Sequence, residues 1–249
     1  MLSAALREAA LTPRLLVATD FDGTLAPLQD DPATVQPHPT AVSALTTLCH
    51  LPETQVCIIS GRSLTDLWAR MPAIPGLLLR GSYGAEVHSP APPGTARATV
   101  DELHDRLHRA LDGTLARLER KTLGVAVHTR GIPRKDAELS FAAAREAVRG
   151  IRGLREVPGF DILDFTVSTY DKGIAITEEA DFFAPTTVVV LGDDPEDEKM
   201  FACAKPRAVT IKVGVTPTRA EFRVKTPQDA ALALSALAEG RTLWATEHA

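Results

Sequence analysis

Three short apolar runs stand out along the chain, and each is followed at once by polar residues or glycine. They are LLVATD at Leu15, QVCIISG at Gln55 and TTVVVLGDD at Thr186. Continuous aliphatic runs of this length are typical of strands that are buried on both faces of a parallel sheet. The pattern therefore predicts three buried parallel strands.

Helical stretches lie between or after these runs. Residues 39–48 and 63–71 have helical character, and Ser63 is a suitable N-cap for the second stretch. Alternation of strand and helix is the pattern of an α/β fold, and we expect a doubly wound, Rossmann-like parallel sheet. In such sheets ligands bind beyond the carboxyl ends of the strands, where all three apolar runs place polar residues.

The middle of the chain has a different pattern. A Pro- and Gly-rich break, SPAPPGTA, occupies residues 89–96. After it come five leucines at helical spacing, Leu103, Leu107, Leu111, Leu115 and Leu118, which predict a helix. A strand-like GVAVHTRG, a helical stretch over residues 141–148 and a second strand-like run, GFDILDFTVS, follow. We expect a core domain over residues 1–90 and 170–249, with a smaller α+β domain inserted over residues 91–169.

The composition disfavours several classes of protein. The chain has 249 residues and a formal net charge of −5, which argues against a general nucleic-acid binder. Its three cysteines are widely spaced and indicate neither a disulfide framework nor a zinc site. No signal peptide is evident, and no apolar run approaches the roughly 18 residues of a membrane-spanning helix. We expect a cytoplasmic protein that binds neither nucleic acid nor membrane; its oligomeric state stays open, and a monomer is compatible with the sequence.

Two acidic residues one position apart end the first apolar run. Side chains alternate along an extended chain, so Asp20 and Asp22 share one side while Phe21 points into the core. Gly23 allows a sharp turn and a close approach to a ligand. Adjacent carboxylates are costly unless a cation neutralises them or one keeps a proton, and both remedies are useful in catalysis. The alternative for an isolated pair is a solvated turn.

The other strand ends favour chemistry over that alternative. GDDPEDE places Asp193, Asp194 and Asp197 after the third run, although acids there could also simply stabilise a helix N-terminus. ISGRS ends the second run with a hydroxyl that can contact a phosphate, and YDKG supplies a lysine, a residue that alone is usually at the surface. Acids for a metal, with a hydroxyl and an ammonium for an anion, together predict a site for metal-assisted phosphoryl transfer.

These strings, in this order, resemble the four motifs of the haloacid-dehalogenase-like phosphatases. The resemblance implies that Asp20 is a nucleophile that forms an aspartyl-phosphate, and that Asp22 is first the acid and then the base. It also implies a Mg²⁺ ion held by Asp20, the backbone carbonyl of Asp22 and Asp193. The presence of Asp22 favours a phosphatase over the dehalogenase and P-type ATPase branches, which lack this acid.

The remaining roles also come from this resemblance. Asp194 and Asp197 would support the metal ligands, and the phosphoryl group would be held by Ser60, Gly61 and Lys172. The inserted segment would be a cap of the second type, which confers selectivity for sugar phosphates in this superfamily.

Several strings are similar to those of trehalose-6-phosphate phosphatases, over about residues 15–237. They include DFDGTLAPL with Pro32, ISGR, GSYGAE, LERKTLGVAVHTR, DKG, GDDPEDE and VGVTPTRAEFRVKTPQD. The resemblance implies that sugar-binding residues are Glu119, Lys121 and Asp164, with Arg62, Glu86, His128 and Arg130 as further candidates. Without a ligand role, Glu119 and Lys121 would lie at an exposed helix end, and His128 would be a hydrogen-bonded strand histidine.

The match has three departures from the family pattern. Ser82 and Tyr83 replace the usual Asn and His, Asp164 replaces a glutamate, and Thr166 replaces a frequent basic residue. The alternatives are a phosphatase for a sucrose, glucosylglycerol or mannosylglycerate phosphate, a phosphosugar mutase, which would retain the phosphoryl group, and a non-catalytic sugar-phosphate sensor. A sensor is expected to lack Asp20, Asp22 or Lys172, and this chain has all three.

Overall fold

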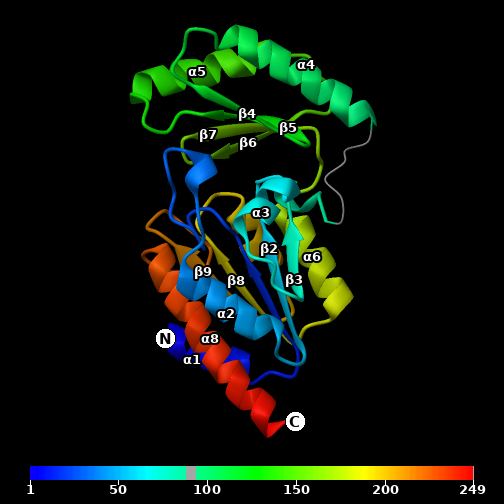
Figure 1. Ribbon diagram of the computed structural model, residues 1–249, viewed down its shortest axis with the longest axis vertical. Helices are drawn as coiled ribbons and strands as arrows, with labels where there is room; N and C mark the ends of the chain where they lie inside the picture. Colours follow the sequence, from blue (N-terminus) through cyan, green and yellow to red (C-terminus); the bar gives the residue numbers. More distant parts are fainter. Residues whose placement is uncertain (88–93, 249) are drawn as a thin grey trace. The chain divides into compact units, whose positions relative to one another are not determined.

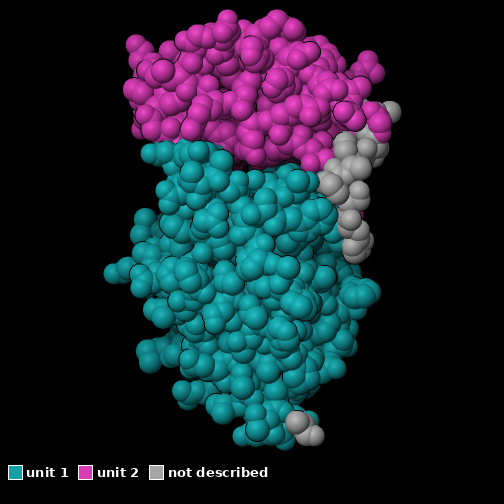
Figure 2. Space-filling model, in the orientation of Figure 1, with its two compact units in different colours: residues 1–87, 171–249 teal, residues 88–170 magenta. Residues whose placement is uncertain are grey.

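The chain forms two compact units in a computed structural model, of which we describe residues 1–87 and 94–248. One unit comprises Met1–Val87 and Asp171–Ala249, and the other comprises His88–Tyr170 (Figure 2). The second unit is therefore inserted into the sequence of the first. Most of the expected break at residues 89–96 lies outside the described residues, which resume at Gly94.

The first unit contains a six-stranded sheet with the order β10-β9-β8-β1-β2-β3, in which all neighbours are parallel (Figure 1). The three apolar runs are β1, β2 and β8, which are consecutive in the sheet, so their prediction is confirmed. The strands are β1 (Leu15–Thr19), β2 (Thr54–Ile59), β3 (Leu77–Arg80), β8 (Thr187–Gly192), β9 (Ala208–Val213) and β10 (Phe222–Val224).

Helices cover both faces of this sheet. Apolar residues of α1, α2 and α8 pack on one face, and those of α6 and α7 pack on the other. This confirms the doubly wound α/β fold. The helices of this unit are α1 (Leu2–Ala10), α2 (Pro39–Cys49), α3 (Leu64–Arg70), α6 (Lys172–Phe183), α7 (Asp197–Cys203) and α8 (Pro227–Glu247).

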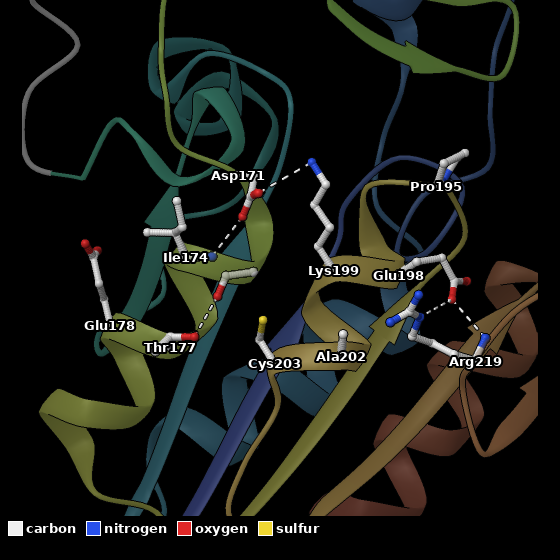
Figure 3. A pocket seen from close by; sticks show the side chains of 11 residues that line it. Asp171, Ile174, Thr177, Glu178, Pro195, Glu198, Lys199, Ala202, Cys203 and Arg219 are labelled. Atoms are coloured by element: carbon white, nitrogen blue, oxygen red, sulfur yellow. Dashed lines mark hydrogen bonds and ion pairs between the residues drawn. The ribbon is translucent and has the colours of Figure 1, made fainter. Parts of the chain in front are cut away.

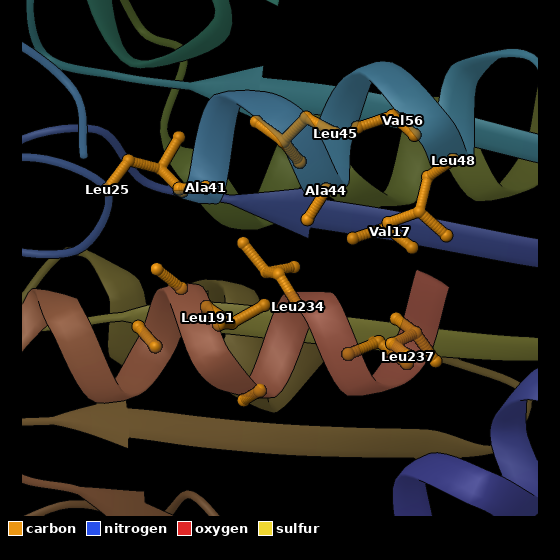
Figure 4. Close-up of a cluster of buried hydrophobic side chains, with 14 of the residues drawn as sticks. Val17, Leu25, Ala41, Ala44, Leu45, Leu48, Val56, Leu191, Leu234 and Leu237 are labelled. Atoms are coloured by element: carbon orange, nitrogen blue, oxygen red, sulfur yellow. The ribbon is translucent and has the colours of Figure 1, made fainter. Parts of the chain in front are cut away.

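The alternation of side chains along β1 determines which face each residue serves. Leu15 and Val17 join the cluster under α2 and α8 (Figure 4), whereas Leu16 and Ala18 join the cluster under α6 and α7. Because the period is two, Asp20 continues the second series and points toward α6 and α7. Phe21 belongs to the first cluster and is fully buried, as predicted.

The second unit contains a four-stranded antiparallel sheet with the order β4-β5-β7-β6. Apolar side chains of one face, including Val125, Val127 and Phe165, pack against α4 and α5. The helices therefore cover one face, in agreement with the predicted α+β fold. The elements are α4 (Gly94–Ala110), β4 (Arg117–Lys121), β5 (Gly124–His128), α5 (Arg134–Ala147), β6 (Arg155–Gly159) and β7 (Ile162–Thr166).

The leucine pattern of this unit overestimates the length of its first helix. α4 ends at Ala110, and Gly113 adopts a positive φ of 75° in the turn that follows. Leu115 is consequently 66% exposed, and Leu118 lies in β4 rather than on a helix. The helical prediction was wrong for these two residues, because a turn and a strand happened to preserve the spacing.

A buried arginine ties the amino edge of the first sheet to α8. The side chain of Arg241 is fully buried and stacks on the ring of Trp244, with its Cζ 3.7 Å from the ring centroid. Its guanidinium donates to five backbone carbonyls from the segments before β1 and β2, those of Ala10, Thr12, Pro13, Pro52 and Glu53. Arg241 thereby supplies donors to carbonyls that burial would otherwise penalise, although the Glu53 carbonyl also accepts from the Leu15 N–H and the Pro52 carbonyl also accepts from Thr54 Oγ1.

Candidate active site

The predicted acids meet at the carboxyl edge of the first sheet. β1 pairs in parallel with β8, with Thr19 opposite Leu191, and the Asp20 N–H donates to the Leu191 carbonyl at 3.0 Å. Asp20 and Asp193 therefore leave adjacent strands at the same edge. The structure brings carboxylate oxygens of Asp20, Asp193 and Asp197 within 4.8 Å of one another. This acidic cluster is the centre of the candidate site.

Lys172 inserts its ammonium group into the acidic cluster. It is the first residue of α6, whose N-cap Asp171 accepts a hydrogen bond from the Ile174 N–H. Its Nζ donates to Asp20 Oδ1 at 2.6 Å and to Asp197 Oδ1 at 2.7 Å, and the lysine is only 2% exposed. Burial opposes the charge, but Asp197 and Asp20 outweigh it and hold the Lys172 pKa well above its usual value.

One lysine does not neutralise the cluster. Burial raises the pKa of Asp20 to about 8, an effect that Lys172 only partly offsets and that Asp197 and Asp194 add to. Burial and Asp20 likewise raise the pKa of Asp193 well above its usual value. Burial and Asp197 raise the pKa of Asp194 to about 6. Without a further cation, the raised pKa values mean that carboxyl groups of the cluster keep their protons to higher pH than exposed carboxyl groups do.

The donor set fits a hard divalent cation. The three converging side chains offer carboxylate oxygens only, which are the ligands that Mg²⁺ and Ca²⁺ prefer. Close packing shapes the cluster as well: a Cβ at Gly23 would overlap the Asp193 carboxylate, and a Cβ at Gly192 would overlap the Asp197 side chain. Gly23 also has φ +75°, so the predicted need for glycine there is confirmed.

Hydrogen bonds hold Asp193 and Asp197, the two members of the acidic cluster that follow β8. Asp197 Oδ2 accepts from the backbone N–H groups of Asp193 and Asp194, at 2.8 and 2.9 Å. Thr24 Oγ1 donates to Asp193 Oδ1 at 3.2 Å, and the buried Lys212 donates to the Asp193 carbonyl. Asp197 thus orients the loop as well as contributing an oxygen to the cluster, while Asp194 Oδ1 caps the Glu196 N–H.

The end of β2 supplies a compact turn. Ser60 is buried, and its Oγ accepts from the Arg62 N–H at 3.1 Å, which leaves the hydroxyl proton available to a ligand oxygen. Gly61 lies against the Tyr83 ring, which a Cβ at this position would meet at 2.8 Å. A larger residue at position 61 would therefore require the Tyr83 ring to move.

Asp22 and Arg62 form a two-pronged ion pair. Arg62 Nε donates to Asp22 Oδ2 and Arg62 Nη2 donates to Asp22 Oδ1, both at 2.7 Å. Arg62 was expected to contact the substrate; its guanidinium also donates to Asp66 and to the Pro32 carbonyl.

Glu86 also has a partner set within the first unit. Its Oε2 accepts from Ser82 Oγ at 2.5 Å and from the Leu64 N–H at 3.2 Å. It thereby holds a loop in which Ser82, Tyr83 and Gly84 all have positive φ, of 49°, 61° and 105°. Asn and His, the usual family residues at the first two positions, tolerate this conformation better than most side chains. These contacts give Glu86 a structural role in the loop.

The remaining candidates gather on the face of the second sheet opposite its helices. Register places Glu119 opposite Ala126 and Ala126 opposite Asp164, so these side chains share one face. Lys121 Nζ contacts Asp164 Oδ2 at 2.5 Å, and His128 Nε2 lies 2.8 Å from Glu119 Oε2. Arg130 lies just after β5 and donates to the Phe160 carbonyl at 3.3 Å. The exposed helix end considered for Glu119 and Lys121 is wrong, because both lie in β4.

Comparison with known proteins identifies the family. The family model described as trehalose-phosphatase matches residues 18–234, most of the chain. This chain belongs to the trehalose-phosphatase family. A trehalose-phosphate phosphatase of Mycobacterium marinum is 34% identical over 239 residues, covering 86% of this chain and 59% of the relative. A bifunctional trehalose-6-phosphate synthase/phosphatase of Thermoproteus tenax is 31% identical, covering 86% of this chain and 30% of the relative.

Solved structures agree on the fold. The C-terminal domain of the C. albicans trehalose-6-phosphate phosphatase superposes with a TM-score of 0.82 at 20% identity, covering 95% of this chain and 96% of that one. The chain of this trehalose-phosphatase family member spans about three fifths of the length of the first curated relatives it matches.

Sequence reasoning missed two residues of the candidate site. Thr24 follows the DFDG string directly, and its hydroxyl could have been noted as a partner for an acid. Lys212 sits in the apolar run of β9, and a lysine inside a buried strand is itself a signal because it needs a nearby acceptor. Both fix Asp193 rather than adding a reactive group.

The first unit also contains a groove that the acidic cluster does not line. It has a volume of about 680 Å³, and its walls come from α6, α7 and the segment around Arg219 (Figure 3). None of the predicted site residues lines it, although Asp171, Gly173 and Pro195 are their sequence neighbours. Over residues 1–87 and 94–248, no helix combines the length and the apolar character needed to cross a membrane.

Proposed function

We propose that this chain is a Mg²⁺-dependent phosphatase that hydrolyses trehalose 6-phosphate to trehalose and phosphate, a step of trehalose formation. The main support for this proposal is the acidic cluster of Asp20, Asp193 and Asp197, with Lys172 bound to Asp20 and Asp197. Membership of the trehalose-phosphatase family supports the substrate. A bound Mg²⁺ ion, held by Asp20, Asp193 and the Asp22 carbonyl and supported by Asp194 and Asp197, would supply the positive charge that the cluster lacks.

The chain's own residues divide the reaction into two steps. A carboxylate oxygen of Asp20 attacks phosphorus as the bond from phosphorus to the sugar oxygen breaks, and Asp22 donates a proton to that oxygen. Water then attacks the aspartyl-phosphate, Asp22 accepts its proton, and the bond between phosphorus and Asp20 breaks. Ser60, Gly61 and Lys172 hold the phosphoryl oxygens.

Asp20 must be ionised to act as the nucleophile. Burial raises the pKa of Asp20 to about 8, and a bound cation would favour its ionised form. Activity is therefore expected to require the metal for the nucleophile as well as for charge neutralisation.

The second unit is proposed as the specificity cap. Its polar sheet face carries Glu119, Lys121, His128 and Asp164, charged and hydrogen-bonding groups of the kind that distinguish one polyol from another. Arg130 lies at the end of the same sheet. The short carboxylate of Asp164 is already paired with Lys121, so the pair would present one fixed arrangement to a sugar.

Phosphate release from a panel of sugar phosphates tests the function. We expect release from trehalose 6-phosphate with Mg²⁺, none in EDTA and none from Asp20→Asn, because an amide neither attacks phosphorus nor binds Mg²⁺ as well. Preferential release from a sucrose, glucosylglycerol or mannosylglycerate phosphate would replace the substrate. Phosphoryl migration without release would indicate a mutase, and full activity of Asp20→Asn would refute the mechanism.

The role of the cap has its own measurement. Glu119→Ala and Lys121→Ala should lower kcat/KM for trehalose 6-phosphate while leaving hydrolysis of a small aryl phosphate largely intact. An unchanged ratio between the two substrates would place these residues outside the sugar site.

A further inference from the structure

Arg62 uses almost all of its hydrogen-bonding capacity on protein groups. A guanidinium has five N–H donors in a fixed fork. Nε and Nη2 donate to the two oxygens of Asp22, Nη1 donates to Asp66 Oδ2 at 2.5 Å, and Nη2 also donates to the Pro32 carbonyl at 3.1 Å. Four of these five donors are therefore engaged with protein groups, so a two-pronged contact with a substrate phosphate would require breaking part of this set.

A second layer holds the guanidinium in place. Asp66 lies one turn after Arg62, on α3, and is itself gripped by Arg70, whose Nε and Nη2 donate at 2.9 and 2.8 Å. The side chain of Arg62 is 8% exposed, and its Cζ lies 5.5 Å from the centroid of the Phe21 ring. The position of the guanidinium is thus set by α3, by the loop at Pro32 and by the core.

Asp22, in contrast, depends on Arg62 for its own position. Its side chain is 30% exposed, and it follows the end of β1 beside the turn at Gly23. The two-pronged pair fixes both the direction and the plane of the carboxylate, because the fork matches its two oxygens. A proton donor must stand within hydrogen-bond reach of the leaving oxygen, so this geometry has catalytic consequences.

We propose that Arg62 is a positioning residue for the acid–base group Asp22, and not a ligand of the substrate. This rests on the proposed function, in which Asp22 donates a proton to the leaving oxygen. Arg62 then acts through Asp22 alone, and its contribution scales with the leaving group's need for a proton. A ligand of the phosphate would instead contribute equally to every phosphate ester.

The test compares two esters that share a phosphate and differ in the leaving group. One is p-nitrophenyl phosphate, which leaves readily, and the other is a simple alkyl phosphate, which needs the acid. We expect Arg62→Gln to lower kcat on the alkyl ester by about 10- to 100-fold, part of the 10²–10⁴-fold that general-acid catalysis typically supplies, with little change on the aryl ester. Arg62→Lys, which keeps the charge but lacks the fork, should recover only part of the loss.

A double-mutant cycle separates positioning from substrate binding. In the Asp22→Asn background, Arg62→Gln should cause no further loss on the alkyl ester, because its effect passes through Asp22. Equal losses on both esters with a raised KM, or full additivity with Asp22→Asn, would overturn the proposal.

Arg70→Gln is the matched control. It removes an arginine from the same Asp66 but leaves the pair between Arg62 and Asp22 in place, so it should lower the melting temperature and change the ratio between the esters far less than Arg62→Gln does. If Arg70→Gln shifted the ratio as much as Arg62→Gln, general loosening of α3 would explain the effect and the proposal would fail. Hydrolysis of both esters without hydrolysis of trehalose 6-phosphate would count against the proposed substrate and leave the result for Arg62 standing.

Discussion

Two lysines of the first unit offer a matched comparison of buried and exposed ion pairs. Lys172 contacts Asp20 and Asp197 at 2.6 and 2.7 Å with its side chain 3% exposed. Lys199 contacts Glu196 and Asp171 at 2.7 and 3.4 Å with its side chain 42% exposed. Replacing each by methionine removes one ammonium and two contacts, so the two variants differ mainly in burial.

Burial determines the expected magnitude. Removing one partner of a buried ion pair costs about 3–5 kcal/mol, because the remaining charge is left without compensation. Removing an exposed pair costs about 0–1 kcal/mol. At about 2–4 °C per kcal/mol for a domain of this size, Lys172→Met should lower the melting temperature by on the order of 10 °C, and Lys199→Met by less than about 4 °C.

The sign of the pH dependence also follows from the structure. Lys172 lowers the pKa of Asp20, so its removal raises that pKa further above the value of about 8. A carboxyl with a raised pKa in the folded state takes up a proton on folding, and this stabilising protonation is lost as the pH rises toward the folded-state pKa. Well below pH 8 the wild type and Lys172→Met lose this stabilisation in parallel, but near pH 8 wild-type Asp20 ionises and its loss slows, while the loss in the variant continues. The deficit of Lys172→Met should therefore be larger at pH 8 than at pH 5.

Urea denaturation in EDTA at both pH values measures the deficit. Lys172→Met should also lack phosphatase activity, whereas Lys199→Met should retain it. Equal free energies of unfolding for the two variants at pH 8 would refute the reasoning, since burial would then have no effect on the cost.

Three further predictions concern the metal, a glycine and the amino edge. In EDTA the wild-type protein should lose stability as the pH rises from about 4 to 8, because burial raises the pKa of Asp20 from 3.8 to about 8. Thermal melts across this range should show a decline in melting temperature that Mg²⁺ reverses, and a melting temperature independent of pH would contradict the prediction. The Cβ of Gly23→Ala would overlap the carboxylate of Asp193, a proposed metal ligand. The substitution should therefore weaken Mg²⁺ binding about 10- to 100-fold in a calorimetric titration, the usual effect of losing support for a metal ligand. Unchanged affinity would show that the loop adapts. Arg241→Met should cost at least about 3 kcal/mol in urea denaturation, because it removes the hydrogen bonds to five carbonyls, of which those of Pro52 and Glu53 keep another donor. Arg207→Met loses only an exposed pair with Glu8 and should cost under about 1 kcal/mol.

The parallel core could be predicted because its signals are local. β1, β2 and β8 are aliphatic runs that end in polar residues, and parallel pairing brings those ends to one edge whatever the intervening chain does. This is why Asp20, Asp193 and Lys172, far apart in the sequence, could be expected in one place.

Other features depend on long-range packing that no window of sequence reveals. The leucine spacing that ends in Leu115 and Leu118 is helical by count, but Gly113 breaks the helix first. The partners of Arg62 are equally invisible in ISGR, because Asp22 and Pro32 reach it only after the chain folds. The departure at Ser82 and Tyr83 could be seen in the sequence, but its cost in left-handed backbone could not.

The position of Arg241 bears on how such a chain can be joined to others. The carbonyls it binds precede β1 and β2, at the edge of the sheet opposite the acidic cluster, and α8 ends within a few residues of it. Both chain ends lie in the lower half of the first unit in Figure 1. Extra polypeptide fused at either end would leave from the side of the first unit opposite the acidic cluster, which is compatible with relatives in which the matching region is only 59% or 30% of the length. Truncating α8 before Arg241, in contrast, would remove the hydrogen bonds that join α8 to the end of α1 and to the segment between α1 and β1.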